Sequence, residues 1–321
     1  MEGRVGIRLA AAMAILVIAS ACGGGGAGAP SPTESNAKVS ITVLYTAATD
    51  PLPVWVAADD GIFASHDLEV TLKQVQGAGD TPPALSSGTA QMGLLTTPDL
   101  LFAAQGGLDV VIAAGLTTQS KPDRAALIAG KDSGIKTAAD VAGKRVALTT
   151  RGSFLEIGLN QLLKKQNVDW KTIKWVEMPF PQMTAALASK QIDAALLVPP
   201  FLAAAEKAGD PKIVDLNDLG PNELQALLGT TRIWANANTS ALRRFRQSLT
   251  EAVTKIDADP AAAQTIESKY TGIAPAIVKN IPFPVWNFAP TAGQVQFWID
   301  TMKGLGELNK DLKGSQFIVQ P

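Results

Sequence analysis

The sequence predicts an α/β fold of two lobes, and three observations lead to this prediction. Short apolar strands alternate with short helices along most of the chain, a pattern typical of layered folds with largely parallel sheets. The same order of elements occurs twice, with residues 125–129 between the two occurrences. The residues from Lys38 onward suffice for two lobes of ordinary domain size, and 46% of the chain is apolar, which provides for two cores.

The chain begins with a segment typical of a secretory signal peptide, predicted over residues 1–21. Its apolar run, Leu9 to Ala21, follows two arginines, is too short to span a bilayer as a mature helix, and ends in small residues. Cys22, the only cysteine, comes next, which resembles the lipobox of bacterial lipoproteins, where the thiol is lipidated. Residues 22–37 are rich in Gly, Ala, Ser and Pro and are predicted to be a flexible linker. The alternative is an ordinary signal peptide that leaves a free thiol.

The first half is predicted to begin with a strand over 39–45 and a helix that Pro53 opens and Gly61 ends. From Leu68 to Leu72 apolar and polar residues alternate, which is the period of a strand with one wetter face. Thr97 is predicted to be a helix N-cap, followed by proline at the first helical position. The other elements expected here are a helix over 81–87, a buried strand over 91–95 and a strand over 110–114.

The second half is predicted to repeat this order, and long helices are expected to follow it. Ser153 and Glu156 have the spacing of a capping box, which opens a helix to about Gln166. Beyond Gly229 one more strand is expected, then a helix whose apolar residues recur at three-to-four spacing from Leu242 to Ile256. The other elements expected are strands over 145–148, 173–178, 192–198 and 230–235, and helices over 137–141, 181–189, 200–208, from 260 onward and over 294–305.

Two sets of short motifs resemble one known family. In the first half these are Val56-Ala57, Gly61-Ile62-Phe63, Leu68-Glu69-Val70, Ala84-Leu85, Gly88 and Gln91-Met92-Gly93. In the second half they are Asp140 to Val146, Gly152-Ser153, Ala186-Leu187 and Gln191 to Ala194. The pattern is similar to that of the nitrate, sulfonate and taurine binding proteins of ABC importers, and thiamine-precursor binding proteins share it. The resemblance covers about residues 39–201.

The resemblance implies a type II periplasmic-binding fold, a clamshell whose two lobes close over a ligand. Lobe 1 would comprise residues 38–124 and 231–321, and lobe 2 residues 125–230. Each lobe would be a mixed, mostly parallel sheet flanked by helices. Two crossing strands, 125–129 and 230–235, would form the hinge.

The resemblance also implies a function. The protein would be an extracytoplasmic receptor of an ABC importer that captures a small organic anion or related solute, of sulfonate, nitrate or taurine type. It would deliver this ligand to a permease that works with ATPase subunits, as a monomer anchored by lipid on Cys22 at the extracytoplasmic face of the cell membrane. A receptor for a pyrimidine or thiamine precursor is the alternative within the family. A pyrimidine-synthase-like enzyme and an anchored sensor are the alternatives of other classes.

The sequence offers no constellation that indicates catalysis, a metal or a cofactor, so none of these is expected. His66 is the only histidine, which leaves neither a metal-ligand cluster nor a partner for a Gly-flanked nucleophile. No glycine-rich phosphate loop ends in Lys-Ser or Lys-Thr, and the cysteine-rich motif of the synthase is absent. The formal net charge of −1 argues against nucleic acid as a partner.

Candidate ligand contacts follow predicted strands, because ligands of open α/β sheets bind at the carboxyl ends of strands beside helix N-termini. Arg151 comes after such a strand, where its guanidinium group could hold a carboxylate or sulfonate by two hydrogen bonds. Arg232, in the strand predicted over 230–235, has a comparable claim, and the alternative is that it pairs with an acid across the hinge. Phe180, between two prolines, is the expected aromatic contact. Capping is the expected role of the Ser153 side chain. The full candidate set is Thr46, Thr49, Gly79, Asp80, Thr96, Thr97, Arg151, Gly152, Ser153, Phe180, Pro199, Phe201 and Arg232.

Overall fold

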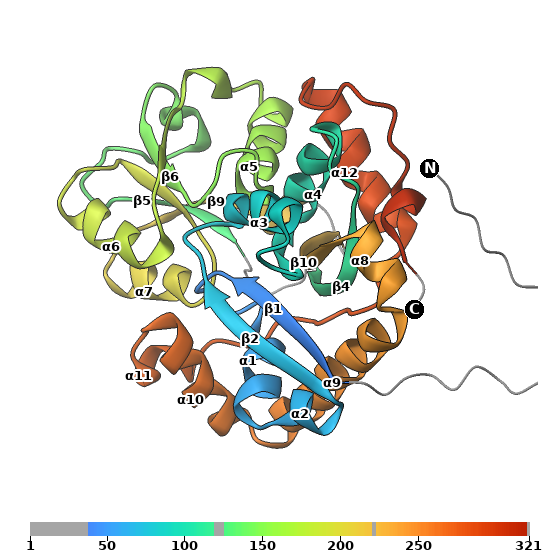
Figure 1. Cartoon of the computed structure of the whole chain (residues 1–321). Helices are drawn as coiled ribbons and strands as arrows, with labels where there is room; N and C mark the ends of the chain where they lie inside the picture. Colours follow the sequence, from blue (N-terminus) through green and yellow to red (C-terminus); the bar gives the residue numbers. More distant parts are fainter. Residues whose placement is uncertain (1–37, 119–124, 220–222, 320–321) are drawn as a thin grey trace, which may run out of the picture. The chain divides into compact units, whose positions relative to one another are not determined.

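The computed structural model describes residues 38–118, 125–219 and 223–319. The predicted signal peptide, lipidation site Cys22 and linker lie outside these described residues. Within them the chain forms two five-stranded sheets flanked by helices (Figure 1). The α/β class and the two lobes are therefore confirmed.

The first sheet has the strand order β2-β1-β3-β10-β4. Strand β1 pairs in parallel with β2 and β3, whereas β10 runs antiparallel to both β3 and β4. All strands except β10 thus point in one direction, so the sheet is mixed and mostly parallel. Its strands are β1 (Val39–Tyr45), β2 (Leu68–Gln74), β3 (Met92–Thr96), β4 (Val110–Thr118) and β10 (Leu224–Thr231).

The second sheet repeats this topology with the order β7-β6-β8-β5-β9. Strand β6 pairs in parallel with β7 and β8, and β5 runs antiparallel to β8 and β9. In both sheets the reversed strand is the one with which the chain arrives from the other sheet. The strands are β5 (Ala126–Ala129), β6 (Arg145–Leu148), β7 (Lys174–Glu177), β8 (Ala194–Leu197) and β9 (Lys212–Asp215).

Helices cover both sheets. Those of the first part of the chain are α1 (Leu52–Asp59), α2 (Ile62–Ser65), α3 (Thr81–Ser87) and α4 (Thr97–Gln105), and those that follow β6, β7 and β8 are α5 (Phe154–Lys165), α6 (Phe180–Ala188) and α7 (Phe201–Lys207). The C-terminal helices are α8 (Arg232–Ala237), α9 (Thr239–Ala258), α10 (Pro260–Thr271), α11 (Pro275–Val278) and α12 (Ala292–Leu305). Short 3₁₀ helices are η1 (Ala78–Asp80), η2 (Ala138–Val141), η3 (Trp170–Thr172), η4 (Leu216–Leu219) and η5 (Gly314–Phe317). None of the helices in the described ranges has both the length and the apolar character needed to cross a bilayer.

The C-terminal helices return to the first sheet and also reach the second lobe. Helix α9 packs against α1, while α12 packs against α4 and α5 (Figure 1). Trp298 of α12 is fully buried and meets the ring of Phe154, the first residue of α5, edge-on with 5.7 Å between ring centroids. The apolar core of the second lobe is thereby continuous with the α4 and α12 side of the first sheet. This packing places the start of α5 beside the first sheet.

The prediction of a strand over residues 230–235 is wrong, because β10 ends at Thr231 and α8 begins at Arg232. These residues therefore do not form a crossing strand of the hinge. Strand β10 ends at Thr231, whose side chain accepts a hydrogen bond from the N–H of Trp234 at 3.2 Å and so caps α8. Because β10 starts at Leu224 and pairs within the first sheet, residues 224–230 belong to that sheet. The sequence prediction had placed them in the second lobe. Strand β9 was missed, because its four residues alternate too briefly to show a period.

Candidate functional site

Several strands converge on one cavity between the two sheets. It lies at the carboxyl ends of β1, β3, β6 and β8 and at the amino end of β10. The cavity has a volume of about 50 Å³, which is room for a few waters or a small polar group. The lining residues are Thr46, Ala48, Asp50, Ala78, Leu94, Thr96, Thr149, Ser153, Phe154, Leu155, Phe180, Val198, Gln225 and Ala226.

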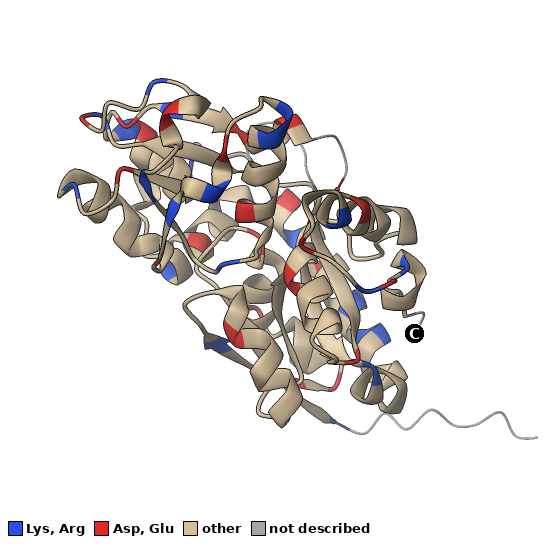
Figure 2. Ribbon diagram, turned by 90° about the horizontal axis from the view of Figure 1, so that it is seen from above, with Lys and Arg blue, Asp and Glu red and all other residues tan. Residues whose placement is uncertain are grey.

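The walls of this cavity are mostly apolar, with polar side chains at a few points. Among the described lining residues Asp50 is the only one with an ionisable side chain, and its Oδ1 accepts a hydrogen bond from the hydroxyl of Thr117. Elsewhere on the ribbon acidic and basic residues are interspersed rather than gathered by sign (Figure 2). Of the predicted candidates, the structure brings together Thr46, Thr96, Ser153 and Phe180 at the cavity wall.

Thr96 connects the two lobes at this wall. It ends β3 and is the N-cap of α4, and the carboxylate of Asp99 accepts hydrogen bonds from its N–H at 2.8 Å and its hydroxyl at 2.6 Å. Its Oγ1 also accepts the N–H of Phe154 from the second lobe at 3.0 Å. Burial raises the pKa of Asp99 to about 6, although the hydrogen bonds from Thr96 oppose this shift. The N-cap predicted at Thr97 was therefore one residue late.

Ser153 does not cap α5, contrary to the sequence prediction. It occupies the N-cap position, but its side chain makes no capping hydrogen bond. Glu156 instead accepts from the N–H of Gly152 at 2.6 Å and from both ends of the Arg151 guanidinium fork at 2.8 Å. The Ser153 residue is 2% exposed, and its Oγ has no hydrogen-bond partner. The hydroxyl is therefore available to a ligand in the cavity that it lines.

Gln225 was missed by the sequence reasoning and lines the cavity from the first sheet. It is 3% exposed, and its Oε1 has no hydrogen-bond partner. Ligand contacts were expected after strands, whereas Gln225 lies at the start of β10, the reversed strand. The signal that was available is a lone polar residue in the apolar run Leu224 to Leu228.

Thr49, Pro199 and Phe201 lie beside the cavity without lining it. The N–H of Thr49 donates to the carbonyl of Pro199 at 3.2 Å, which links the loop after β1 to the loop after β8. The Thr49 hydroxyl donates to Glu267 of α10. Phe201 stacks on Phe180 with 5.6 Å between ring centroids. Phe180 itself is the first residue of α6 and is buried, where the sequence had suggested a loop position.

Arg151, Gly152 and Gly79 line a more open groove beside the cavity, not the cavity itself. The Arg151 guanidinium group is engaged by Glu156 and lies 5.5 Å from the ring centroid of Trp175. The hydrogen bond to Glu156 raises the pKa of Arg151. Arg151 does not point at an anionic ligand in this structure, because the two guanidinium nitrogens that would bind the ligand already bind Glu156.

Three further candidates make structural contacts and do not line the cavity. Asp80 accepts a hydrogen bond from the N–H of Gln76 at 3.2 Å, and the Thr97 hydroxyl donates to the carbonyl of Leu224 at 2.7 Å. Arg232 donates to Asp109 at 3.0 Å and to the carbonyl of Gln316 at 2.7 Å. It follows β10, so the whole strand separates it from Gln225, roughly 20 Å at the rise of a β-strand. Arg232 therefore does not belong to the cavity.

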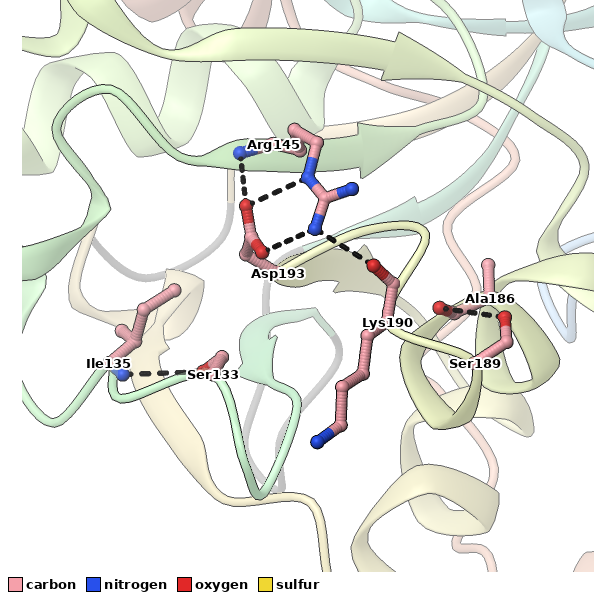
Figure 3. A network of polar contacts seen from close by, with 7 residues as sticks. All are labelled: Ser133, Ile135, Arg145, Ala186, Ser189, Lys190 and Asp193. Carbon is pink, nitrogen blue, oxygen red and sulfur yellow. Dashed lines mark hydrogen bonds and ion pairs between the residues drawn. The ribbon is translucent and has the colours of Figure 1, made fainter.

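A second hollow lies on the second lobe, and the basic side chain of Arg145 in its wall is paired with other lining residues. Its wall includes Arg145, whose guanidinium group donates to Asp193 at 2.7 and 3.1 Å and to the carbonyl of Lys190 at 2.8 Å (Figure 3). The hydrogen bond from Arg145 lowers the pKa of Asp193. This network ties the turn before β8 to β6 and is structural. No group of His, Cys, Asp and Glu side chains in the described part of the chain could hold a metal ion.

A family model described as NMT1/THI5 like matches residues 48–263. The chain belongs to this family. Among solved structures, the alkanesulfonate-binding protein SsuA from Xanthomonas axonopodis pv. citri bound to MOPS aligns with a TM-score of 0.73 and 21% identity, over 84% of this chain and 94% of that chain. The periplasmic nitrate-binding protein NrtA from Synechocystis aligns with a TM-score of 0.72 and 16% identity, over 85% and 82%. At these identities the likeness establishes the periplasmic-binding fold.

Two curated relatives carry provisional names as binding proteins. One, from Brachyspira hyodysenteriae, is named as an ABC transporter periplasmic binding protein and is 33% identical over 135 residues, 42% of this chain. The other, from Brucella abortus, is named as a binding protein and is 25% identical over 220 residues, 67% of this chain. The matches span 38% and 66% of the lengths of these relatives. The NMT1/THI5-like family and the fold of SsuA and NrtA thus agree with the resemblance seen in the sequence.

Proposed function

We propose that the protein is the extracytoplasmic solute-binding receptor of an ABC importer. It captures a small solute between its lobes and delivers it to a permease that works with ATPase subunits. The observation that carries this proposal is the cavity between the two sheets, because both lobes build it and it contains two buried polar atoms without partners, Ser153 Oγ and Gln225 Oε1. Buried polar groups are normally hydrogen-bonded, so such atoms in a cavity call for a ligand.

The polar contacts between the lobes beside the cavity suit a protein that opens and closes. In the described residues these are three backbone N–H groups: Thr49 donates to the carbonyl of Pro199, Phe154 to the hydroxyl of Thr96, and Gly79 to the hydroxyl of Thr150 at 3.3 Å. Hydrogen bonds of this kind exchange readily for hydrogen bonds to water. We propose that the lobes divide where the chain leaves the first sheet after β4 and where it re-enters that sheet before β10.

Two classes of ligand follow from the sequence and the relatives. The first is a small anion, as the descriptions of SsuA as alkanesulfonate-binding and of NrtA as nitrate-binding indicate for those proteins. The start of α5 at the cavity supports an anion, because helix N-termini favour negative charge. The second is a neutral polar ring such as a pyrimidine precursor, which the apolar walls and the ring of Phe180 support.

Mass spectrometry of the purified full-length protein under native conditions tests the receptor. We expect a small solute that stays bound in the folded protein and is released on denaturation. Adding more of that solute should raise the unfolding temperature in proportion to the logarithm of its concentration. If no solute is bound, if no sulfonate, carboxylate, nitrate or heteroaromatic compound raises the unfolding temperature, and if a substrate is instead turned over, the protein is an enzyme.

The remaining parts of this proposal concern the setting of the receptor. We propose that it is a monomer without catalytic activity or cofactor. We also propose that it is lipidated on Cys22 and held at the extracytoplasmic face of the membrane. The support is the sequence pattern around Cys22 together with relatives that are named as binding proteins.

A further inference from the structure

We propose that Gln225 and Ser153 are the two polar anchors of the ligand, and that they select an uncharged edge with both hydrogen-bond donor and acceptor groups, such as an amide or a lactam ring. This inference rests on the proposed receptor function and names the substrate class of its site. It favours the neutral class over sulfonate or nitrate.

The backbone around Gln225 is irregular in a way that directs this side chain. Leu224 lies opposite Thr118 on β4, and Ala226 lies opposite Thr117, so Gln225 is an extra residue without a partner on β4. Such a β-bulge turns a side chain out of its regular alternation, and bulges are frequent beside binding sites. The carbonyl of Leu224 is held by Thr97 and by the Trp298 indole N–H at 2.9 Å, which fixes the start of the strand.

The side chain of Gln225 has no structural task that would explain its burial. Its Oε1 is without a hydrogen-bond partner although the residue is 3% exposed. Leaving a buried polar group unsatisfied is unfavourable, and a leucine of similar size would avoid that cost in this apolar run. A carboxamide at this position therefore indicates a partner that arrives with the ligand.

Ser153 supplies the second anchor from the other lobe. Its hydroxyl lines the same cavity, is buried and is likewise without a partner. The carboxylate of Glu156, which a capping box would place at the Ser153 N–H, binds the Gly152 N–H and the Arg151 guanidinium group instead. Gln225 belongs to the first sheet and Ser153 to the start of α5. A ligand that binds both side chains therefore bridges the lobes and favours their closure.

The charges around the cavity decide between a neutral ligand and an anion. Among the described residues that line it, none is basic and Asp50 is acidic. An anion transferred from water into mostly apolar walls needs a charge partner, and a carboxylate on the wall adds repulsion. A carboxamide and a hydroxyl instead match a neutral edge, because each of them can donate and accept.

Matched pairs of small molecules test the class of ligand. We suggest acetamide with acetate, nicotinamide with nicotinate, and uracil with orotate, titrated calorimetrically into the full-length protein after bound solute has been removed. At least one neutral member should bind at least tenfold more tightly than its anion. Binding of an anion with equal or higher affinity, or of none of the neutral members, overturns the inference. The receptor proposal still stands in either case if native mass spectrometry finds a bound solute.

Substitution of Gln225 by leucine tests the anchor, because loss of a ligand contact should weaken binding without lowering stability, whereas loss of a structural contact should lower stability. Gln225→Leu should weaken binding of the neutral compound at least tenfold, while the ligand-free protein unfolds at the same or a higher temperature. Ser153→Ala should weaken binding in the same way. The matched control is Gln182→Leu on α6, an exposed position outside the cavity, which should leave affinity unchanged. A Gln225→Leu protein that binds as tightly as wild type, or that loses stability without ligand, contradicts the proposal.

Discussion

At the residue scale, the loop before α5 shows why a local motif can be recognised and still be assigned the wrong contacts. The spacing of Ser153 and Glu156 correctly indicated a helix start. The backbone at Gly152 adopts φ +78°, a left-handed conformation that glycine tolerates, and its N–H points at Glu156. The carboxylate therefore binds one residue earlier than a capping box requires, and Ser153 is left for the cavity. The spacing of Ser153 and Glu156 in the sequence does not predict the φ angle of Gly152, and so it does not predict this contact.

The raised pKa of Asp99 gives the first prediction, on the pH dependence of stability. Its pKa is about 6 in the folded protein and lies near 3.8 when the group is unperturbed. The folded state therefore holds the proton more tightly between these values, so this group contributes stability below about pH 4 and loses it as pH rises through 6. The loss is about 3 kcal/mol at most, from two pKa units.

Urea unfolding of the wild type and of Asp99→Asn between pH 4 and 8 measures this contribution. Asparagine keeps an oxygen that accepts from Thr96 but does not titrate. The difference in unfolding free energy between the two proteins should fall from pH 4 to about 6 and then stay level. Two curves that remain parallel throughout would show that Asp99 titrates normally.

At the element scale, parallel strands were predictable and the reversed strand was not. The order of strands and helices from β1 to β4 and from β6 to α7 follows from apolar periodicity, caps and glycines. Candidates at the carboxyl ends of β3 and β6, such as Thr96 and Ser153, accordingly line the cavity. Strand β10 runs the other way, so its amino end reaches the cavity and brings Gln225 there. Strand direction depends on pairing between distant segments, which a single sequence does not show.

The contact between η1 and the loop after β6 gives a prediction about closure. A Cβ placed on Gly77 would lie 2.8 Å from the carbonyl oxygen of Thr149 and would also meet Thr150 Oγ1, both in the second lobe. Gly77 has an extended backbone at φ −152°, which any residue can adopt, so an alanine is strained only by its contact with the second lobe, and opening of the lobes would relieve that strain. Gly77→Ala should therefore lower solute affinity about tenfold or more, roughly 1.4 kcal/mol, without lowering the unfolding temperature of the ligand-free protein.

Small-angle X-ray scattering with the solute found by native mass spectrometry checks this effect. The radius of gyration of the wild type should fall when solute is added, and that of Gly77→Ala should fall less. Gly293→Ala, on α12 with no clash within 3.4 Å, is the matched control and should behave like the wild type. Equal compaction of both variants would mean that the η1 contact does not limit closure.

At the scale of the whole molecule, two sheets of one topology are joined so that each reversed strand receives the chain from the other. The repeated element order in the sequence predicted two lobes, and the family resemblance predicted how they are connected. Lobe limits remained inexact because the apolar residues of β10 were assigned by chain position rather than by sheet. What neither source supplied is the chemistry of the cavity. Side chains that are satisfied elsewhere, such as Arg151, are indistinguishable in sequence from those that are free.

Membrane attachment through Cys22 is the last prediction, and it concerns a part of the chain outside the described residues. A lipoprotein signal ends at the cysteine that is acylated, and two or three acyl chains hold a protein on a bilayer where one chain alone is readily released. Cys22→Ser should therefore move the protein from the membrane fraction to the soluble fraction and abolish labelling by a fatty acid, without changing solute affinity. Ser31→Ala in the predicted linker should remain in the membrane fraction. If Cys22→Ser stays bound to membranes, another segment or a partner anchors the receptor.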